Sequence, residues 1–168
     1  REFERIKAAF PSTRFVEAID ASILQAKVEL SGSLEGVLAL QEESMAKAQG
    51  PARLLNPSTM AGQLVNHPKL ASFDPKAVLA AVIGYRERAH KAAADEASFA
   101  GVPNEQREYL KTYALSAVEL VVAKAHLNAG DIAKAQASLD AYRKAGGATG
   151  GNYHYVVAGV AEKQGRNA

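Results

Sequence analysis

"HLNAGDIAKAQASLDAYRKAGG", residues 126–147, is the stretch that decides the fold. Gly130 lies between two alanine-rich segments, and glycine is the usual residue just beyond the end of an α-helix. Asp131 follows it as a residue whose carboxylate can cap a new helix, and Gly146 and Gly147 end that second helix. The stretch therefore predicts a helix, a tight turn and another helix.

The rest of the chain has the same helical character. Alanine is abundant, glycines and prolines occur at intervals, and strictly alternating apolar and polar residues are scarce, a pattern typical of an all-α protein. We predict a single all-α domain over 1–168 with about six or seven helices paired as antiparallel hairpins. Its expected parts are irregular N-terminal helices at 1–50, a proline-rich loop at 51–75, a helical core at 76–147 and the start of a further repeat at 148–168.

The N-terminal part contains two predicted helices. Pro11 to Thr13 offers a cap for the segment 14–50, in which apolar residues recur at steps of three and four. Gly32 lies in the middle of "SGS", and glycine in a helix interior costs about 1 kcal/mol relative to alanine. We therefore place a turn between two helices at Gly32.

The segment 51–75 has a different composition. It holds four of the six prolines, at positions 51, 57, 68 and 75, and each proline removes a backbone donor and disfavours helix in the preceding residue. We predict a long, partly ordered loop with a short helix around Thr59 to Asn66. Its apolar residues indicate that this loop packs across the helical bundle.

Two longer helices follow the loop. Asp74 is the predicted N-cap of the first, with Pro75 at the first helical position. Its buried stripe is predicted at Val78, Ala81, Val82 and Tyr85. Asn104 is the predicted cap of the second helix, which Gly130 ends. Its buried stripe is predicted at Leu110, Ala114, Ala117 and Val121.

The C-terminal segment echoes the helix that precedes Gly130. When "NYHYVVAGVAEKQGRN" is set beneath "AVELVVAKAHLNAGDI", Gly165 falls beneath Gly130 at an offset of 35 residues, and Val157 falls beneath Val122. By itself "YHYVVAGVA" is also compatible with a strand, because it is rich in tyrosine and valine. The register with a helical segment favours a helix.

A helix–turn–helix unit at this period resembles the tetratricopeptide repeat, whose usual length is about 34 residues. The resemblance rests on a small residue at Ala123, on Gly130 and Asp131 in the turn, and on Ala135. It covers about residues 117–168, and it departs from the family pattern because no aromatic residue precedes Ala123 and no proline closes the unit. Stacked units of this family curl into a groove that is lined by the first helix of each unit.

The resemblance implies that four positions of the complete unit face this groove: Leu120, Lys124, Leu127 and Asn128. A lysine beside an amide could hold the carboxylate or the backbone of a peptide; the alternative is that Lys124 is a solvated surface residue. Tyr153 and His154 lie at the start of the next helix. They either stack on a ligand or join adjacent helical pairs.

Other polar motifs carry no catalytic or metal signature. Glu87 and His90 form an E-x-x-H pair on one helix face, but a carboxylate-bridged di-iron bundle needs a second pair and two further glutamates. A surface role is therefore favoured, and no metal is predicted. His67 is interpreted as a turn residue. The glycine-rich stretch 145–152 lacks the lysine of a phosphate-binding loop and is interpreted as a flexible connector.

Composition excludes several classes of function. Cysteine is absent, which excludes disulfides, cysteine-ligated metals and a thiol nucleophile. The net charge of +2 is spread along the chain and tryptophan is absent, so we expect no nucleic-acid partner. The apolar runs are shorter than the roughly 20 residues that span a membrane. The chain begins with Arg1, which we interpret as a sign of a removed leader or of a longer parent chain, with an exported location favoured over a cytoplasmic one.

The sequence therefore predicts a non-catalytic protein–protein interaction module that binds a peptide segment or a partner protein and needs no cofactor. Self-association or membership of a larger assembly is compatible with this prediction. The alternative from another class is a helical-bundle sensor in which the proline-rich loop covers a small-molecule pocket. An enzyme is the least favoured interpretation, because no catalytic motif is present.

Overall fold

The structure is a computed structural model that describes residues 2–9 and 16–166. Within these ranges it contains eight α-helices: α1 (Glu2–Ala9), α2 (Val16–Leu30), α3 (Leu34–Lys47), α4 (Ala52–Val65), α5 (Pro75–Ala93), α6 (Asn104–Asn128), α7 (Ile132–Lys144) and α8 (Gly151–Lys163). Two short 3-10 helices, η1 (Leu70–Ser72) and η2 (Glu96–Phe99), flank α5. No strand occurs in the described residues, so the predicted all-α fold is confirmed. None of these helices is long and apolar enough to cross a membrane.

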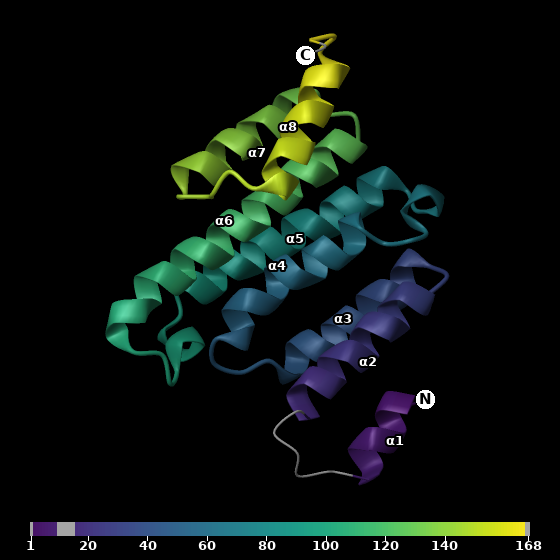
Figure 1. Cartoon of the computed structure of the whole chain (residues 1–168), viewed down its shortest axis with the longest axis vertical. Coiled ribbons are helices and arrows are strands. Elements are labelled where there is room, and N and C mark those ends of the chain that lie inside the picture. Colours follow the sequence, from purple (N-terminus) through teal and green to yellow (C-terminus); the bar gives the residue numbers. More distant parts are fainter. Residues whose placement is uncertain (1, 10–15, 167–168) are drawn as a thin grey trace.

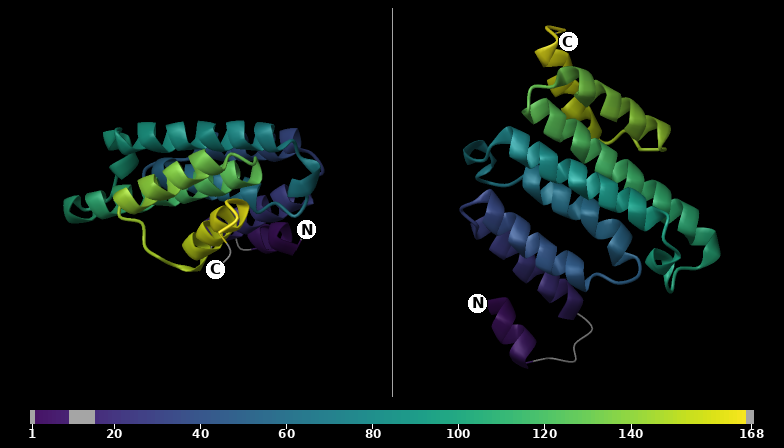
Figure 2. Two further views of the ribbon diagram at one scale, coloured as in Figure 1. Left: turned by 90° about the horizontal axis from the view of Figure 1, so that it is seen from above. Right: turned by 180° about the vertical axis from the view of Figure 1, so that it is seen from behind.

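The helices stack as successive hairpins along the long axis of the molecule, with the two termini at opposite ends (Figure 1). α2 packs on α3, α4 on α5, and α6 on α7. The 25-residue helix α6 lies at the centre of this stack and also packs on α4, α5 and α8. Seen from above, α5 lies on one side of the stack and α8 lies on the other (Figure 2). The face that carries α8 is the one on which the candidate site is found.

Several helix ends lie where local signals in the sequence predict them. Asp74 caps α5 by accepting a hydrogen bond from the Lys76 N–H at 3.0 Å. Gly130 follows α6 with φ +80°, a conformation that favours glycine. The turn at Gly32 separates α2 from α3 as predicted. The cap predicted at Pro11 to Thr13 lies outside the described residues.

The prediction of a loop over 51–75 is wrong for its first half, because α4 forms a 14-residue helix with Pro57 inside it. An interior proline destabilises a helix by about 3 kcal/mol. Tertiary packing offsets this effect, because α4 packs on α3, α5 and α6. Six of its side chains are buried: Leu54, Pro57, Met60, Ala61, Leu64 and Val65. Burial of each large apolar side chain contributes about 1.5–3 kcal/mol, so the helix survives its proline.

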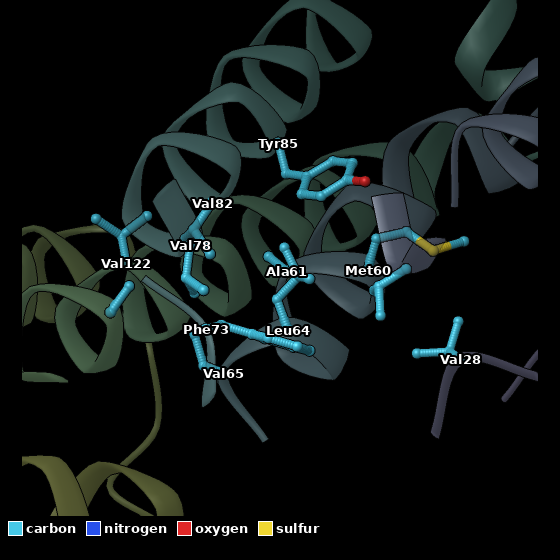
Figure 3. Close-up of a cluster of buried hydrophobic side chains, with 12 residues drawn as sticks. Val28, Met60, Ala61, Leu64, Val65, Phe73, Val78, Val82, Tyr85 and Val122 are labelled. Atoms are coloured by element: carbon cyan, nitrogen blue, oxygen red, sulfur yellow. The ribbon is translucent and has the colours of Figure 1, made fainter. Parts of the chain in front are cut away.

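The main core lies where α4 and α5 meet α6, and it continues to α2 and α3 (Figure 3). Leu64 and Val82 are fully buried in it. A separate cluster around Leu139 and Val160 joins α7 and α8 to α6. This second cluster holds α8 on the end of the stack and thereby sets the position of the side chains that α8 contributes to the candidate site.

The buried stripe of α5 is confirmed at Val78, Val82 and Tyr85. The predicted stripe of α6 is confirmed in part, because Ala114 is buried and Leu110 and Val121 are partly buried against the core. The fully buried residues of α6 also include Val118 and Val122, which the predicted stripe leaves out. Because α6 packs on four helices, more than one of its faces is buried, and a single stripe does not describe it. Asn104 is the first residue of α6 and does not cap it, so the helix starts one residue earlier than predicted.

Candidate functional site

The four residues of α6 that were predicted to face one groove have three different environments. They line two separate surface hollows, apart from Lys124, which contacts Asn66 and Tyr155. α8 lies directly against α6 at Leu127, since a Cβ added to Gly159 would lie 2.6 Å from Leu127 Cδ2. Leu120 lines one hollow, and Leu127 and Asn128 line the other. α8 therefore interrupts the single groove that the resemblance implies.

The larger hollow has a volume of about 480 Å³ and lies between α6, the α7–α8 connection and the start of α8. We call it the tyrosine groove, because four of the six tyrosines of the chain line it. Its lining residues are Tyr109, Thr112, Tyr113, Ser116, Ala117, Leu120, Tyr142, Gly146, Ala148, Gly150, Gly151, Asn152 and Tyr153. None of these residues carries a charge at neutral pH.

The four tyrosines form two stacked pairs. Tyr109 and Tyr113 lie one turn apart on α6, with ring centroids 6.5 Å apart. Tyr142 of α7 and Tyr153 of α8 have ring centroids 5.5 Å apart. Tyr109 is 74% exposed and Tyr113 is 55% exposed. These two rings are therefore exposed side by side on the surface of α6.

A buried glycine allows the second pair to form. The Tyr142 hydroxyl donates to the Ala148 carbonyl at 2.5 Å, and a Cβ on Gly147 would lie 2.3 Å from two carbons of the Tyr142 ring. Only glycine leaves room for the ring here. Arg143 supports the same turn by donating to the Gly147 carbonyl at 2.8 Å. The interpretation of this glycine-rich stretch as a flexible connector is therefore wrong at Gly147, which is packed in place.

Tyr153 and His154, predicted together as a stacking or joining pair, have different surroundings. Tyr153 stacks on Tyr142 and lines the tyrosine groove. His154 is exposed and meets the Tyr153 ring edge-on, with centroids 5.5 Å apart. Tyr153 thus belongs to the candidate site, whereas His154 lies outside its lining.

The two most exposed tyrosines of the groove are not among the predicted site residues, although the sequence carries a signal for them. Tyr109 and Tyr113 occur in "YLKTY", and residues four positions apart lie on the same face of a helix. Neither belongs to the predicted apolar stripe, so two aromatic rings on a polar face of α6 are the pattern that identifies them.

Lys124 forms a cluster with side chains from two other helical segments, one helical turn from both Leu120 and Leu127. Its ammonium donates to Asn66 Oδ1 at 2.6 Å and lies 5.1 Å from the centroid of the Tyr155 ring. Burial lowers the pKa of Lys124. Lys124 is therefore not a freely solvated surface residue; it connects the end of α4 to α6 and α8.

The second hollow has a volume of about 440 Å³ and lies where the α6–α7 turn meets α8. Its lining residues are Leu127, Asn128, Gly130, Ile132, Tyr155, Gly159, Glu162 and Lys163. Glu162 and Lys163 are both exposed, so their opposite charges are largely screened by water. With one aromatic ring and no stacked pair, this hollow offers less apolar surface than the tyrosine groove, which we take as the candidate site.

The two residues of the E-x-x-H pair have different environments. Glu87 is exposed. His90 Nε2 lies 3.5 Å from Oε1 of Glu119, which is buried and also accepts a hydrogen bond from Arg86 Nε at 2.5 Å. No group of three histidine, cysteine or acidic side chains in the described ranges is arranged to hold a metal ion. The Glu119 carboxylate serves to join α5 to α6.

His67 follows α4 in a turn, as predicted, but it is buried and not a surface residue. Its Nδ1 accepts a hydrogen bond from the Lys69 N–H at 3.1 Å, so Nε2 carries the proton. Nε2 lies 2.8 Å from the Val28 carbonyl, to which it donates. His67 therefore ties α2 to the connection between α4 and α5, and it is a structural residue.

His126 is expected to make stability depend on pH. This side chain is buried, its Nδ1 has no partner in the described part of the chain, and burial lowers its pKa from the ordinary value of 6.5. Nearby Asp131 opposes this shift, whereas Lys134 and Arg86 add to it. As the pH falls below 6.5, the unfolded chain binds a proton that the folded chain does not. The free energy of unfolding should therefore be highest above this pH and fall below it.

Urea unfolding of the parent chain and of His126→Gln, measured above and below this pH, checks the prediction. We expect the midpoint of the parent to fall as the pH is lowered and the midpoint of His126→Gln to fall less, since glutamine does not titrate. An equal fall in both proteins would show that other groups carry the pH dependence.

Comparison with known proteins adds no relative from which a function could be transferred. The chain matches no protein family, no curated protein and no solved structure. The candidate site is therefore defined by the chemistry of its own residues.

Proposed function

We propose that this protein is a non-catalytic docking module that holds a peptide segment of a partner protein in the tyrosine groove. The observation that carries the proposal is the pair Tyr109 and Tyr113, whose rings are more than half exposed on a helix that is otherwise well packed. Tyrosine provides a large contact area with little loss of conformational entropy, which is why it is enriched where proteins bind other proteins. These two rings would provide most of the binding energy.

The framework around the rings supports this role, because it is built from packed helices. Tyr142 is 7% exposed and is fixed by its hydrogen bond to Ala148 and by its contact with Tyr153. α6, which carries the other pair, packs on four helices. A groove that is already formed in the free protein loses less conformational entropy when a ligand binds than a groove that the ligand must order. Binding is therefore tighter.

Equivalent helix ends support the further proposal that α6 and α7 form a tetratricopeptide-like unit and that α8 starts the next one. Gly130 and Gly165 have φ +80° and +70°. In each case the N–H of the following residue donates to the carbonyl five residues before it. The same turn therefore recurs at the offset of 35 residues seen in the sequence. In such a repeat the first helices, here α6 and α8, line the binding face.

The structure weakens the alternative of a small-molecule sensor whose pocket is covered by the segment 51–75. Most of that segment forms α4, which is packed into the core. None of its residues lines either of the two hollows. The described fold thus provides no covering loop at these hollows, which favours the docking proposal.

The test is a selection of random peptides displayed on phage, with the whole chain as the target. Peptides enriched on the parent should bind the Tyr155→Ala variant equally well and should lose at least about tenfold in affinity for Tyr109→Ala/Tyr113→Ala. Tyr155 is the matched control, because it is 65% exposed and lies outside the tyrosine groove. If no peptide is enriched, or if the enriched peptides bind the double variant as well as the parent, the proposal is wrong.

A further inference from the structure

We infer that the occupant of the tyrosine groove is a proline-rich segment in the polyproline II conformation. This inference rests on the proposed function and names the class of peptide that the groove binds. Three properties of the groove select this class: the lack of charge in its lining, the aromatic character of its apolar surface and its unused hydrogen-bond donors.

The lining of the groove carries no charged side chain, although 23% of the residues in the chain are charged. Arg143 lies over the Tyr153 ring at the edge of the groove, but it donates a hydrogen bond to the Gly147 carbonyl. A charged peptide would therefore lose hydration of its charges in the groove and gain no ion pair with a lining side chain. Single-stranded nucleic acid also stacks on aromatic rings, but its phosphates require a positively charged channel. The groove is therefore suited to an uncharged occupant.

The apolar surface of the groove consists mainly of aromatic rings. Leu120 is the one large aliphatic side chain of the lining. An amphipathic helix lays its apolar face into a continuous hydrophobic groove, whereas this lining places Thr112, Ser116 and Asn152 among the rings. Proline-rich segments, by contrast, dock in grooves that are lined by aromatic side chains. The exposed rings of Tyr109 and Tyr113 and the stacked pair beside them form such a groove.

The groove also offers hydrogen-bond donors that match a polyproline II backbone. A chain in this conformation has no internal hydrogen bonds, so its carbonyls are free to accept. The hydroxyls of Tyr109, Tyr113 and Tyr153 make no hydrogen bond to other described residues, unlike the Tyr142 hydroxyl. Gly150 provides no side-chain cap for α8, which leaves the first N–H groups of that helix without acceptors. The occupant's carbonyls would satisfy both kinds of donor.

The test is the binding of a blocked decaproline peptide to the full 168-residue chain, with a blocked glycine–serine decapeptide as the control of equal length. The chain has six tyrosines and no tryptophan, and four of the tyrosines line the groove. Binding in the groove is therefore expected to change the tyrosine fluorescence. Decaproline should bind at least about tenfold more tightly than the glycine–serine peptide, because its conformation is preformed and its rings are apolar.

The variants locate the bound peptide. Tyr109→Ala/Tyr113→Ala should weaken decaproline binding at least about tenfold, and Tyr155→Ala should leave it unchanged. The rings of Tyr109 and Tyr113 are both exposed, so the double variant should keep the circular dichroism of the parent. Equal binding of the two peptides, or decaproline binding that the double variant does not weaken, would overturn the inference. Tighter binding of a uridine decanucleotide would overturn it in favour of nucleic acid.

Failure of this inference can be distinguished from failure of the proposed function. If decaproline does not bind, but proline-free peptides from the phage selection bind and depend on Tyr109 and Tyr113, the class of peptide is wrong and the docking function stands. If no peptide depends on these two residues, both the inference and the proposed function are wrong.

Discussion

Replacement of Gln41 by leucine is expected to lower the free energy of unfolding by about 2–4 kcal/mol. Gln41 is a fully buried residue of α3. Its Nε2 donates to the Met60 carbonyl and to Gln63 Oε1, both at 3.0 Å. Its Oε1 accepts a hydrogen bond from the Tyr85 hydroxyl at 2.9 Å. Leucine has a similar size but offers neither donor nor acceptor, so the buried Tyr85 hydroxyl would lose its hydrogen-bond partner. The Met60 carbonyl and the part-buried Gln63 would each lose one hydrogen bond.

These bonds belong to a network that joins four helices. Gln41 of α3 contacts Met60 and Gln63 of α4 and Tyr85 of α5, and Gln63 continues the network to Gln25 of α2 at 2.7 Å. Burial raises the pKa of Tyr85 to about 12, so its phenol remains protonated and able to donate throughout the neutral pH range. Loss of Gln41 should therefore loosen the contact between the α2–α3 hairpin and the rest of the stack.

Urea unfolding followed by circular dichroism measures this effect. Gln106→Leu on the exposed first turn of α6 is the matched control and should change the free energy of unfolding by less than about 0.5 kcal/mol. Combining Gln41→Leu with Tyr85→Phe should destabilise the protein less than the sum of the two single changes, because the unpaired hydroxyl is then absent. A Gln41→Leu variant as stable as the parent would show that the network is not required.

Replacement of Gly147 by alanine is expected to lower the free energy of unfolding by about 2–3 kcal/mol and to weaken groove binding at least about tenfold. The added methyl group would lie 2.3 Å from the Tyr142 ring. The ring cannot easily move away, since Tyr142 is buried, donates to Ala148 and stacks on Tyr153. We therefore expect the stacked pair to separate and one side of the tyrosine groove to lose its shape.

Gly84→Ala is the control for this substitution. Gly84 lies within α5, where an added Cβ meets no atom within 4 Å, so the change should stabilise the protein by up to about 1 kcal/mol and leave peptide binding unchanged. Urea unfolding and the peptide-binding assay provide the two measurements. If Gly147→Ala binds peptides as tightly as the parent, the Tyr142–Tyr153 pair does not shape the binding site.

The helix boundaries that can be predicted from the sequence depend on nearby residues. Asp74 accepts the N–H of a residue two positions later, and the turn at Gly130 is closed by bonds within five residues. Such signals act before any tertiary contact forms. The stripe of α5 is also predictable, because Val78, Val82 and Tyr85 repeat at helical spacing on one buried face.

The prediction for α4 is wrong because the packing of this helix on its neighbours outweighs the local effect of its proline. Pro57 disfavours a helix by itself, but six buried side chains of α4 favour one once α3, α5 and α6 are in place. The same explanation applies to His67. Its ring is buried against Phe73 and bonded to the Val28 carbonyl, and that carbonyl lies 39 positions earlier in the chain.

By itself the sequence determined the all-α class, the positions of most turns and the absence of cysteine chemistry, because composition and short-range capping decide these properties. It also indicated the helix at 151–163, through the register of this segment with the helix before Gly130. Only the tertiary structure decided that α6 is central, that α8 covers part of the predicted groove, and that Tyr109, Tyr142 and Tyr153 line one hollow. These features depend on packing between residues distant in the chain, and helical periodicity does not specify which faces of different helices meet.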